Sequence, residues 1–401
     1  MVESGLREAK RFTAVVAGKE IVIETGKLAE QAGGAVTVQV SDTVLFAAAT
    51  MSRNASLHLD FVPLTVEYEE KLYAAGRIPG SFFRREGRPA EGAILTGRVV
   101  DRTLRPLFPK DLRNEVQVIM MSLSHDQEHQ IDMIGVLAAS TALMISDIPW
   151  AGPVAGVRIG MIDGELVVNP TISEMENSTL DLRVSGTADA INMVECGAQE
   201  IDEQTMLKAL ALAHESIQPL IQIQHEMRAA LGKDKVAYEG DKGEDALLDE
   251  VSAKVGDQVR QIVIDKTDRE GRNEALEEVR KALVAEYEAH NAGITDDTQK
   301  IQLRHVREAL SAVIKREVRR RITADGVRPD GRNYTQIRPL AAEVALIPRV
   351  HGSGLFTRGQ TQVLSIATLG TPGDAQELDG VSPEDEKRYL HHYNMPPYST
   401  G

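Results

Sequence analysis

The sequence has almost no cysteine and no long apolar run. Cys196 is the single cysteine among 401 residues, so no internal disulfide can form, and a reducing, cytoplasmic environment is expected. No stretch approaches the ~18 consecutive apolar residues that a membrane-spanning helix needs. The first twelve residues are charged and lack the apolar core of a secretory signal. These absences favour a cytoplasmic protein with no membrane partner.

The usual patterns of several catalytic and metal-binding classes are also missing. No zinc-ligand spacing and no convincing Ser-His-Asp set is present. The glycine-rich run 351–354 follows neither the P-loop nor the dinucleotide-binding pattern, and a tight turn is expected there. His391 and His392 are adjacent, so in a strand they would point to opposite faces and would not chelate one metal. Cys196 is expected to be a buried core thiol. The residue patterns therefore point to neither a serine-type triad nor a zinc site.

Charge is distributed unevenly along the chain. Acidic residues outnumber basic ones, 60 to 45, giving a formal net charge of −15. Residues 77–110 nevertheless hold eight basic and three acidic side chains, and residues 315–332 hold seven and three. Residues 239–300 hold 17 acidic and nine basic side chains. The acidic total excludes a protein that coats nucleic acid over its whole surface, but the two basic tracts favour local binding of a polyanion.

The first 230 residues predict one α+β domain, because strand-like runs precede helix-like ones. Strands are predicted at 21–23, 35–40, 43–50, 61–68, 116–123, 154–162, 166–169, 180–184 and 190–194. Residues 131–146 are apolar nearly all round, which indicates a buried helix. Asp163-Gly164 predicts a hairpin turn. Helical spacing from Met206 to Leu220 predicts a helix with a kink at Pro219.

Composition changes beyond residue 240. Residues 240–323 lack proline, are poor in aromatics and are rich in Glu, Lys and Ala, which predicts a separate domain of three or four helices. Strand-like runs resume at 344–347 and 361–368. Residues 42–50 resemble residues 360–368, and residues 61–68 weakly resemble 391–398, so two copies of one domain are expected. We thus predict a first core at 1–235, an all-α linker domain at 240–323 and the start of a second core at 325–401.

Residues 77–89 form the most informative segment. Pro79-Gly80 and Gly87 indicate a loop. Two adjacent aromatics, Phe82 and Phe83, stand beside Arg84, Arg85 and Arg88. Bases can stack on phenylalanine and guanidinium groups can form forked bonds to phosphates, so the pattern suits single-stranded nucleic acid. The alternative is that the aromatics anchor a core and that the arginines pair with the neighbouring glutamates.

Two further groups of basic residues can be interpreted either as binding sites or as ordinary parts of a helix. Arg98, Arg102 and Arg105 lie on one helical face and, with Arg77, are expected to add phosphate contacts; the alternative is a solvated helix end with local ion pairs. The cluster at 315–321 closes a predicted helix, where cations complement the helix dipole without any ligand. Contact with RNA or with another subunit is the second interpretation of that cluster.

Four segments closely resemble bacterial polynucleotide phosphorylase: 73–89, 101–109, 328–332 and 351–359. The resemblance runs in order from about residue 12 to the end. It implies two RNase PH-like cores around an all-α domain, each core a ribosomal-protein-type βαβ half and a second α/β half. It also implies processive degradation of single-stranded RNA from the 3′ end, with inorganic phosphate as co-substrate and release of nucleoside diphosphates. A homotrimeric ring, a place in an RNA-degradation complex and the loop 82–88 at a channel constriction are further expectations.

The same resemblance places the chemistry outside this chain. In the family, phosphate and Mg²⁺ are handled by the second core, at positions past residue 401, and the natural gene is expected to continue there with an arginine pair. The first copy does not substitute: Asp181 is followed by Arg183 where the active copy carries lysine, and the second metal-binding aspartate falls near Met175. One carboxylate beside an arginine is a poor Mg²⁺ site. The 401 residues alone are therefore expected to be inactive, and a non-catalytic RNA-binding ring subunit of an exosome-like assembly is the alternative.

Overall fold

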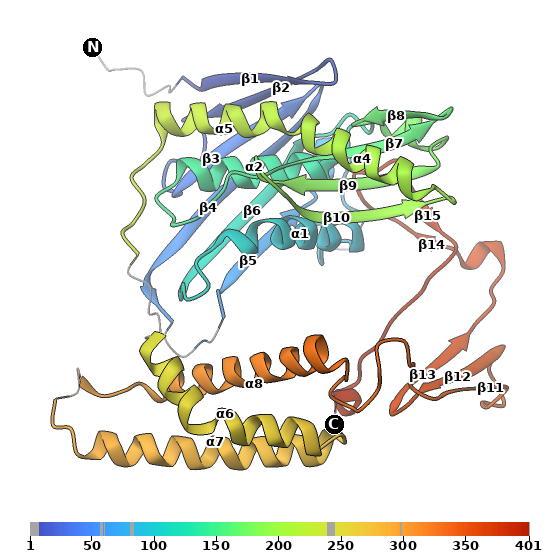
Figure 1. Cartoon of the computed structure of the whole chain (residues 1–401). Coiled ribbons are helices and arrows are strands. Elements are labelled where there is room, and N and C mark those ends of the chain that lie inside the picture. The colour runs from blue at the N-terminus through green and yellow to red at the C-terminus, as the bar shows by residue number, and fades with distance from the viewer. Residues whose placement is uncertain are drawn as a thin grey trace. The chain divides into compact units, whose positions relative to one another are not determined.

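The computed structural model describes residues 8–56, 59, 61–80, 84–238, 245–296 and 299–400. Contacts divide the chain into two compact units, Met1–Gly240 with Pro372–Gly401, and Asp241–Thr371. Figure 1 shows strands and helices mixed in the first unit, and a helical group followed by a small sheet in the second. No helix within the described residues has the length and apolar composition needed to cross a bilayer.

The larger sheet of the first unit has the strand order β1-β2-β3-β4-β6-β5. Its strands are β1 (Lys10–Val16), β2 (Lys19–Thr25), β3 (Gly34–Val40), β4 (Thr43–Ala55), β5 (Leu64–Glu69) and β6 (Asn114–Ser124). All neighbours are antiparallel except β5 and β6. A parallel pair needs a crossover, and here the chain between β5 and β6 contains η1 (Leu72–Ala75), α1 (Glu91–Leu104) and η2 (Arg105–Leu107).

Helix α2 (Ile131–Ile145) organises the core, as its apolar sequence predicts. Fourteen of its residues are buried, and it packs against β3 and β4 of the larger sheet and against β7 of the second sheet. Gly34 permits this approach, because a Cβ there would lie 2.1 Å from the carbonyl oxygen of Ala142. Each fully buried aliphatic side chain in this core contributes roughly 1.5–3 kcal/mol.

The second sheet has the order β10-β9-β7-β8. It comprises β7 (Ala155–Ile162), β8 (Glu165–Val168), β9 (Leu180–Gly186) and β10 (Ile191–Ala198), with the short α3 (Ile172–Met175) between β8 and β9. Asp163 and Gly164 have φ values of 52° and 84°, so the predicted hairpin turn is present. Helices α4 (Glu203–Ser216) and α5 (Gln218–Leu231) follow. Pro219 stands in the first turn of α5, and the expected kink is a break into two helices, because proline fits a helix start better than its interior.

The second unit begins with three long helices, α6 (Asp245–Asp265), α7 (Arg269–Ala292) and α8 (Leu303–Asp325). Their apolar residues recur at helical spacing and form one core with Val251, Val259, Leu283, Val306 and Leu310 among its members. A three-stranded sheet follows, β11 (Leu340–Val344), β12 (Gly352–Arg358) and β13 (Thr361–Ala367), in the order β11-β12-β13. The predicted α+β class and the all-α domain are confirmed.

The last described residues belong to the first unit. They contain η4 (Pro372–Asp374), β14 (Gln376–Glu377), β15 (Glu386–Lys387) and η5 (Pro397–Thr400). Strands β14 and β15 pair antiparallel. Val381, in the turn between them, is 2% exposed, so this hairpin is packed against the rest of the unit.

Several local predictions differ from the structure. A turn was expected at residues 351–354, but β12 begins at Gly352, and the strand expected at 344–347 lies at 340–344. Strand β1 was not predicted, although Phe12, Ala14 and Val16 alternate with more exposed residues along it. Cys196 is exposed, not buried, because it lies on β10, whose residues from Val194 onward face solvent. His391 and His392 lie in irregular backbone outside any strand.

Candidate functional site

The predicted basic loop leads into helix α1. Phe82 and Phe83 lie outside the described residues, so the stacking prediction is not placed in the structure. Arg84, Arg85 and Arg88 are exposed. Arg84 and Gly87 have φ values of 50° and 66°, so the backbone turns sharply at two points within a few residues. The arginines are thereby presented on an irregular exposed segment, where a phosphate backbone could reach them.

Helix α1 displays two of the predicted arginines. Its buried face includes Ala93, Gly97 and Val100, because Gly97 lies against β5: a Cβ there would be 3.2 Å from the Val66 carbonyl oxygen. Arg98 and Arg102 are on the exposed face. Arg102 pairs with Glu195 at 2.8 Å, with both side chains about half exposed. Arg98 has no ion pair with any residue in the described part of the chain.

Arg105 is held entirely by protein groups. Its guanidinium forms two bonds to Asp101, at 2.9 and 2.6 Å, and donates to the backbone carbonyls of Val62 and Leu64 at 2.9 and 3.0 Å. The Leu64 carbonyl belongs to the first residue of β5 and the Val62 carbonyl lies two residues before it. Arg105 therefore connects the end of α1 to the start of that strand. This is the local ion pairing that the sequence left open as the alternative to phosphate binding.

Arg77 is held by a distant part of the chain. Its guanidinium donates to the Gly380 carbonyl at 2.6 Å and lies 3.4 Å from a carboxylate oxygen of Asp379. Among the predicted phosphate contacts, the structure thus leaves Arg98 without a carboxylate partner and gives carboxylate partners to Arg77, Arg102 and Arg105.

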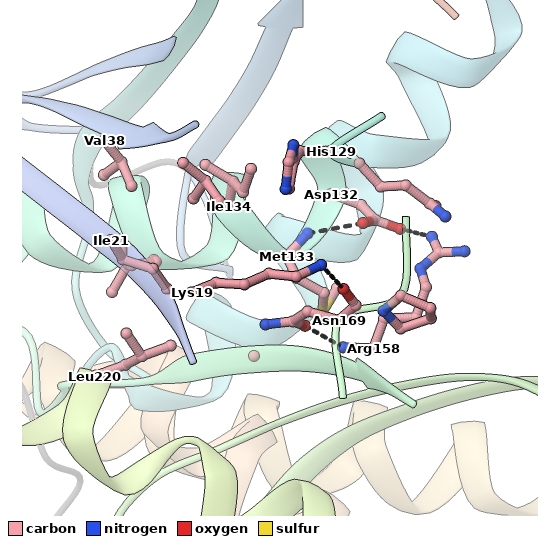
Figure 2. Close-up of a pocket in the computed structure, with 15 residues that line it drawn as sticks. Lys19, Ile21, Val38, His129, Asp132, Met133, Ile134, Arg158, Asn169 and Leu220 are labelled. Carbon is pink, nitrogen blue, oxygen red and sulfur yellow. Dashed lines mark hydrogen bonds and ion pairs between the residues drawn. The ribbon is translucent and has the colours of Figure 1, made fainter. Parts of the chain in front are cut away.

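A partly buried network of two aspartates and two arginines joins α2 to the second sheet. Arg158 on β7 donates to Asp132 on α2 at 2.5 Å and to Asp181 on β9 at 2.8 Å. Arg183 on β9 lies 3.1 Å from Asp132 and 3.0 Å from Asp181. Burying a charge is costly unless it is paired, and here each carboxylate faces two guanidinium groups. Figure 2 shows Asp132 and Arg158 turned toward each other.

Asp132 and Arg158 were not singled out from the sequence. Each is a charged residue inside an apolar run, Ile131 to Ile145 and Ala155 to Ile162, and a charge there is expected to be paired. That signal could have found them. Asp181 was singled out from the resemblance. In the structure its carboxylate forms ion pairs with Arg158 and Arg183.

The turn before α2 is built on Asp126. Its carboxylate accepts from the N–H groups of Glu128 and His129, both at 2.9 Å, and lies 2.7 Å from Nδ1 of His129. Partial burial opposes ionisation, but these hydrogen bonds outweigh it and lower the pKa of Asp126 to about 2. Burial lowers the pKa of the nearby His125. The turn is therefore an anionic, hydrogen-bonded structure at neutral pH.

A small pocket of about 50 Å³ opens beside this turn and the ionic network. Ile21, Val38, Ile134 and Leu220 form its apolar side in Figure 2, and Lys19, His129, Asp132, Arg158 and Asn169 lie at its polar side. The polar groups are largely paired with one another: Lys19 donates to the Asn169 carbonyl at 2.7 Å, and the Asn169 side chain accepts from the Arg158 N–H at 3.0 Å. The volume suits a few water molecules.

The arrangement does not fit a divalent metal. Within the described ranges no group of three or more His, Cys, Asp or Glu side chains is placed to hold an ion. Mg²⁺ requires carboxylate or other oxygen ligands in octahedral geometry, whereas the oxygens of Asp132 and Asp181 point at guanidinium groups. The exposed loop and helix α1 instead present arginines that are suited to contacts with anions.

The first part of the second basic tract, residues 315–321, lies on α8. Glu317 is buried and accepts from Arg260 at 2.9 Å and Arg320 at 3.1 Å, and Arg260 is the largest cause of its lowered pKa. Part of the 315–321 cluster therefore supports the helical core. Contact of this cluster with RNA or another subunit stays a prediction.

Models of known families match nearly all of the chain. Residues 17–149 and 336–401 match the 3′ exoribonuclease family, domain 1, and residues 152–216 match domain 2 of the same family. Residues 246–333 match the polyribonucleotide nucleotidyltransferase RNA binding domain. One model thus matches two separate segments, which agrees with the internal repeat seen in the sequence.

Curated relatives are identical to this chain at about half of the aligned positions. A polyribonucleotide nucleotidyltransferase of Geobacillus kaustophilus (strain HTA426) is 49% identical over 398 residues, covering 98% of this chain and 54% of that protein. Another, of Bacillus velezensis, is 48% identical over 402 residues, covering 98% and 55%. The chain spans about half the length of the curated relatives it matches. Among solved structures, an Archaeoglobus fulgidus exosome with RNA bound to the active site matches with a TM-score of 0.40 and 20% identity, covering 52% of this chain and 87% of that one.

Proposed function

The chain belongs to the 3′ exoribonuclease family and is related over almost its whole length to polyribonucleotide nucleotidyltransferases; on this premise we propose that it serves in 3′-to-5′ phosphorolysis of single-stranded RNA. In this reaction inorganic phosphate attacks the last phosphodiester and a nucleoside diphosphate leaves. The observation that carries the proposal is the 49% identity over 398 residues to a protein of that name. The RNA-binding-domain match at 246–333 supports RNA as the ligand.

The exposed arginines of the loop are proposed to bind the RNA backbone. Arg84, Arg85 and Arg88 are all exposed on a sharply turning segment, and guanidinium groups form forked bonds to phosphate oxygens. We include Phe82 and Phe83 as stacking partners for bases, on the sequence pattern alone. The loop would thus bind single strands without reading their sequence.

The α1 arginines and Arg77 divide into two roles in this proposal. Arg98 is exposed and without a carboxylate partner among the described residues, so it extends the phosphate-binding surface. Arg102 can exchange Glu195 for a phosphate, because an exposed ion pair contributes only about 0–1 kcal/mol. Arg105 and Arg77 are each held by a carboxylate and by backbone carbonyls, so we assign them to holding α1 and the loop in place.

The chemical step is proposed to lie outside the core formed by residues 1–235. Both carboxylates of the partly buried network are neutralised by Arg158 and Arg183, and neither is available to a metal. The divalent cation of the reaction, which we take to be Mg²⁺, would bind elsewhere in the whole protein, and we propose that the 401-residue chain by itself binds RNA without cleaving it. A homotrimeric ring, participation in an RNA-degradation complex and a cytoplasmic location are further parts of the proposal.

A phosphorolysis assay tests the proposal. The natural protein, as its gene encodes it, is incubated with poly(A), inorganic phosphate and Mg²⁺, and nucleotide products are separated by chromatography. We expect ADP as the product and no reaction without phosphate. Release of AMP without phosphate would contradict the proposal, since it would indicate hydrolysis. RNA binding with no nucleotide release by the natural protein would favour the alternative, a non-catalytic ring subunit.

A further inference from the structure

The segment 372–400 contacts the chain on both sides of the basic loop. This segment and the loop belong to the same compact unit, although about 300 residues separate them in sequence. On the N-terminal side, Asp379 and Gly380 meet Arg77 and Gly80. On the C-terminal side, Lys387 meets Glu91, the first residue of α1. One short hairpin therefore holds both ends of the segment that carries Arg84, Arg85 and Arg88.

Asp379 makes the central contact. One carboxylate oxygen accepts from the Gly80 N–H at 3.1 Å, and the other lies 3.4 Å from the Arg77 guanidinium. Arg77 also donates to the Gly380 carbonyl at 2.6 Å. A single side chain thus fixes two points of the stretch 77–80, directly before the loop. Hydrogen bonds to a carboxylate are stronger than neutral ones.

The hairpin is anchored well enough to act as a support. Val381, next to Gly380, is 2% exposed. Lys387 lies 2.7 Å from Glu91, and this contact is the largest cause of the lowered pKa of Glu91. The buried valine lies between the two polar contacts in sequence, so a change at Asp379 alone would leave the hairpin attached.

We propose that Asp379 is a positioning residue for the RNA-binding loop: through Gly80 and Arg77 it holds the loop arginines in the arrangement that binds a phosphate backbone. This inference rests on the proposed function of the loop. A loop whose ends are already fixed loses less conformational entropy when RNA orders it, and so binds more tightly. The second domain copy, which contributes Asp379, would in this way set the RNA affinity of the first.

If Asp379 acted only through its charge, removing that charge would be expected to raise the affinity for RNA. Asp379 is negative and lies beside a site that binds a polyanion, so removing its charge would strengthen the attraction of RNA. A weakened affinity after Asp379→Asn would therefore reflect positioning. Glu195→Gln is the matched control: Glu195 is also a half-exposed carboxylate paired with an arginine, Arg102 in the last turn of α1, but among the described residues no ion pair joins it to either end of the loop.

The test measures binding of a fluorescent oligo(A) to the full 401-residue chain in phosphate-free buffer, at several salt concentrations. We expect Asp379→Asn to weaken binding about three- to tenfold, with the salt slope unchanged. Glu195→Gln should bind as tightly as the wild type or more tightly. Asp379→Glu, which keeps the charge, should recover part of the loss. Equal or tighter binding by Asp379→Asn would overturn the inference.

A second readout needs no RNA. Limited trypsin digestion should cleave after Arg84 and Arg85 several-fold faster in Asp379→Asn than in the wild type or Glu195→Gln, because the loop end is released. Equal cleavage rates would overturn the inference even if the variant bound RNA weakly. If Arg84, Arg85 and Arg88 can all be changed to alanine without effect on binding, the proposed function of the loop fails, and the digestion result still decides the positioning role. Thermal unfolding checks that each variant is folded.

Discussion

Replacing Arg158 by leucine should destabilise the first unit severely. The guanidinium is 8% exposed and bridges Asp132, itself 11% exposed, and Asp181. Leucine would leave Asp132 buried with Arg183 as its single cationic partner. Breaking a buried ion pair by removing one partner costs about 3–5 kcal/mol, since an uncompensated charge remains. Because Asp181 is 33% exposed and can recover some hydration, we expect a loss near the lower end, about 3 kcal/mol.

Urea unfolding followed by tryptophan fluorescence measures this loss. Trp150 is the single tryptophan, and it is 6% exposed in the same core as α2 and β7, so its emission reports this unit. Arg102→Leu is the control, because it removes an exposed pair and should cost at most about 1 kcal/mol. The double variant Arg158→Leu with Asp132→Asn should be more stable than Arg158→Leu alone. A loss below about 1 kcal/mol for Arg158→Leu, or no recovery in the double variant, would refute the buried-charge reasoning.

Three further predictions concern the loop, the Asp126 turn and the cysteine. Changing Arg84, Arg85 and Arg88 together to alanine should weaken RNA binding and flatten its salt slope by ~0.7 per lost phosphate contact; an unchanged slope in a salt titration would remove the loop from the interface. Asp126→Asn should cost about 1 kcal/mol at neutral pH, allowing for partial exposure, because the folded pKa of about 2 lies below the reference value of 3.8. That stabilisation is complete above pH 4 and is lost as pH falls toward 2, so the difference between Asp126→Asn and the wild type in urea unfolding should shrink over that range; a pH-independent difference would contradict it. Cys196 is exposed with a pKa raised by partial burial, so one thiol per native chain should react with a maleimide, faster as pH rises above 8; a native chain that reacts only after denaturation would contradict its placement.

The strands and helices of the first unit could be predicted because their signals are local. Asp163-Gly164 specifies its turn through backbone conformation, and the apolar run at 131–146 can only be a helix buried on most sides. β12 was missed because its first residues, Gly352 to Gly354, have the composition of a turn. They adopt a strand because β11 and β13 pair with them on both edges, and pairing of this kind is not local.

The arginines of the candidate site could be predicted, but their partners could not. Asp379 is 302 residues from Arg77, and Glu195 is 93 residues from Arg102. Only the folded chain brings these pairs together. Asp101 and Arg105 are four residues apart on one helix, so their ion pair could be predicted from the sequence. The resemblance to a known family supplied the RNA-binding interpretation, which residue patterns left open.

The resemblance to a known family identified Asp181 but not the residues that pair with it. Asp181 was identified as a lone carboxylate that could not hold Mg²⁺ with an arginine beside it. The structure adds a second carboxylate, Asp132, and a second arginine, Arg158, so the site is a paired, charge-balanced cluster. The pairing of each carboxylate with two guanidinium groups was not predicted, because it depends on residues that only the tertiary structure brings together.

The most direct test of the account is nucleotide release by the 401-residue chain with poly(A), inorganic phosphate and Mg²⁺, measured beside RNA binding by the same sample. We predict that the chain binds the RNA, with an affinity that falls as salt rises, and releases no nucleoside diphosphate. Phosphate-dependent shortening of poly(A) that Asp181→Asn abolishes would contradict it, because it would place the chemistry in the core where Asp181 is held between Arg158 and Arg183.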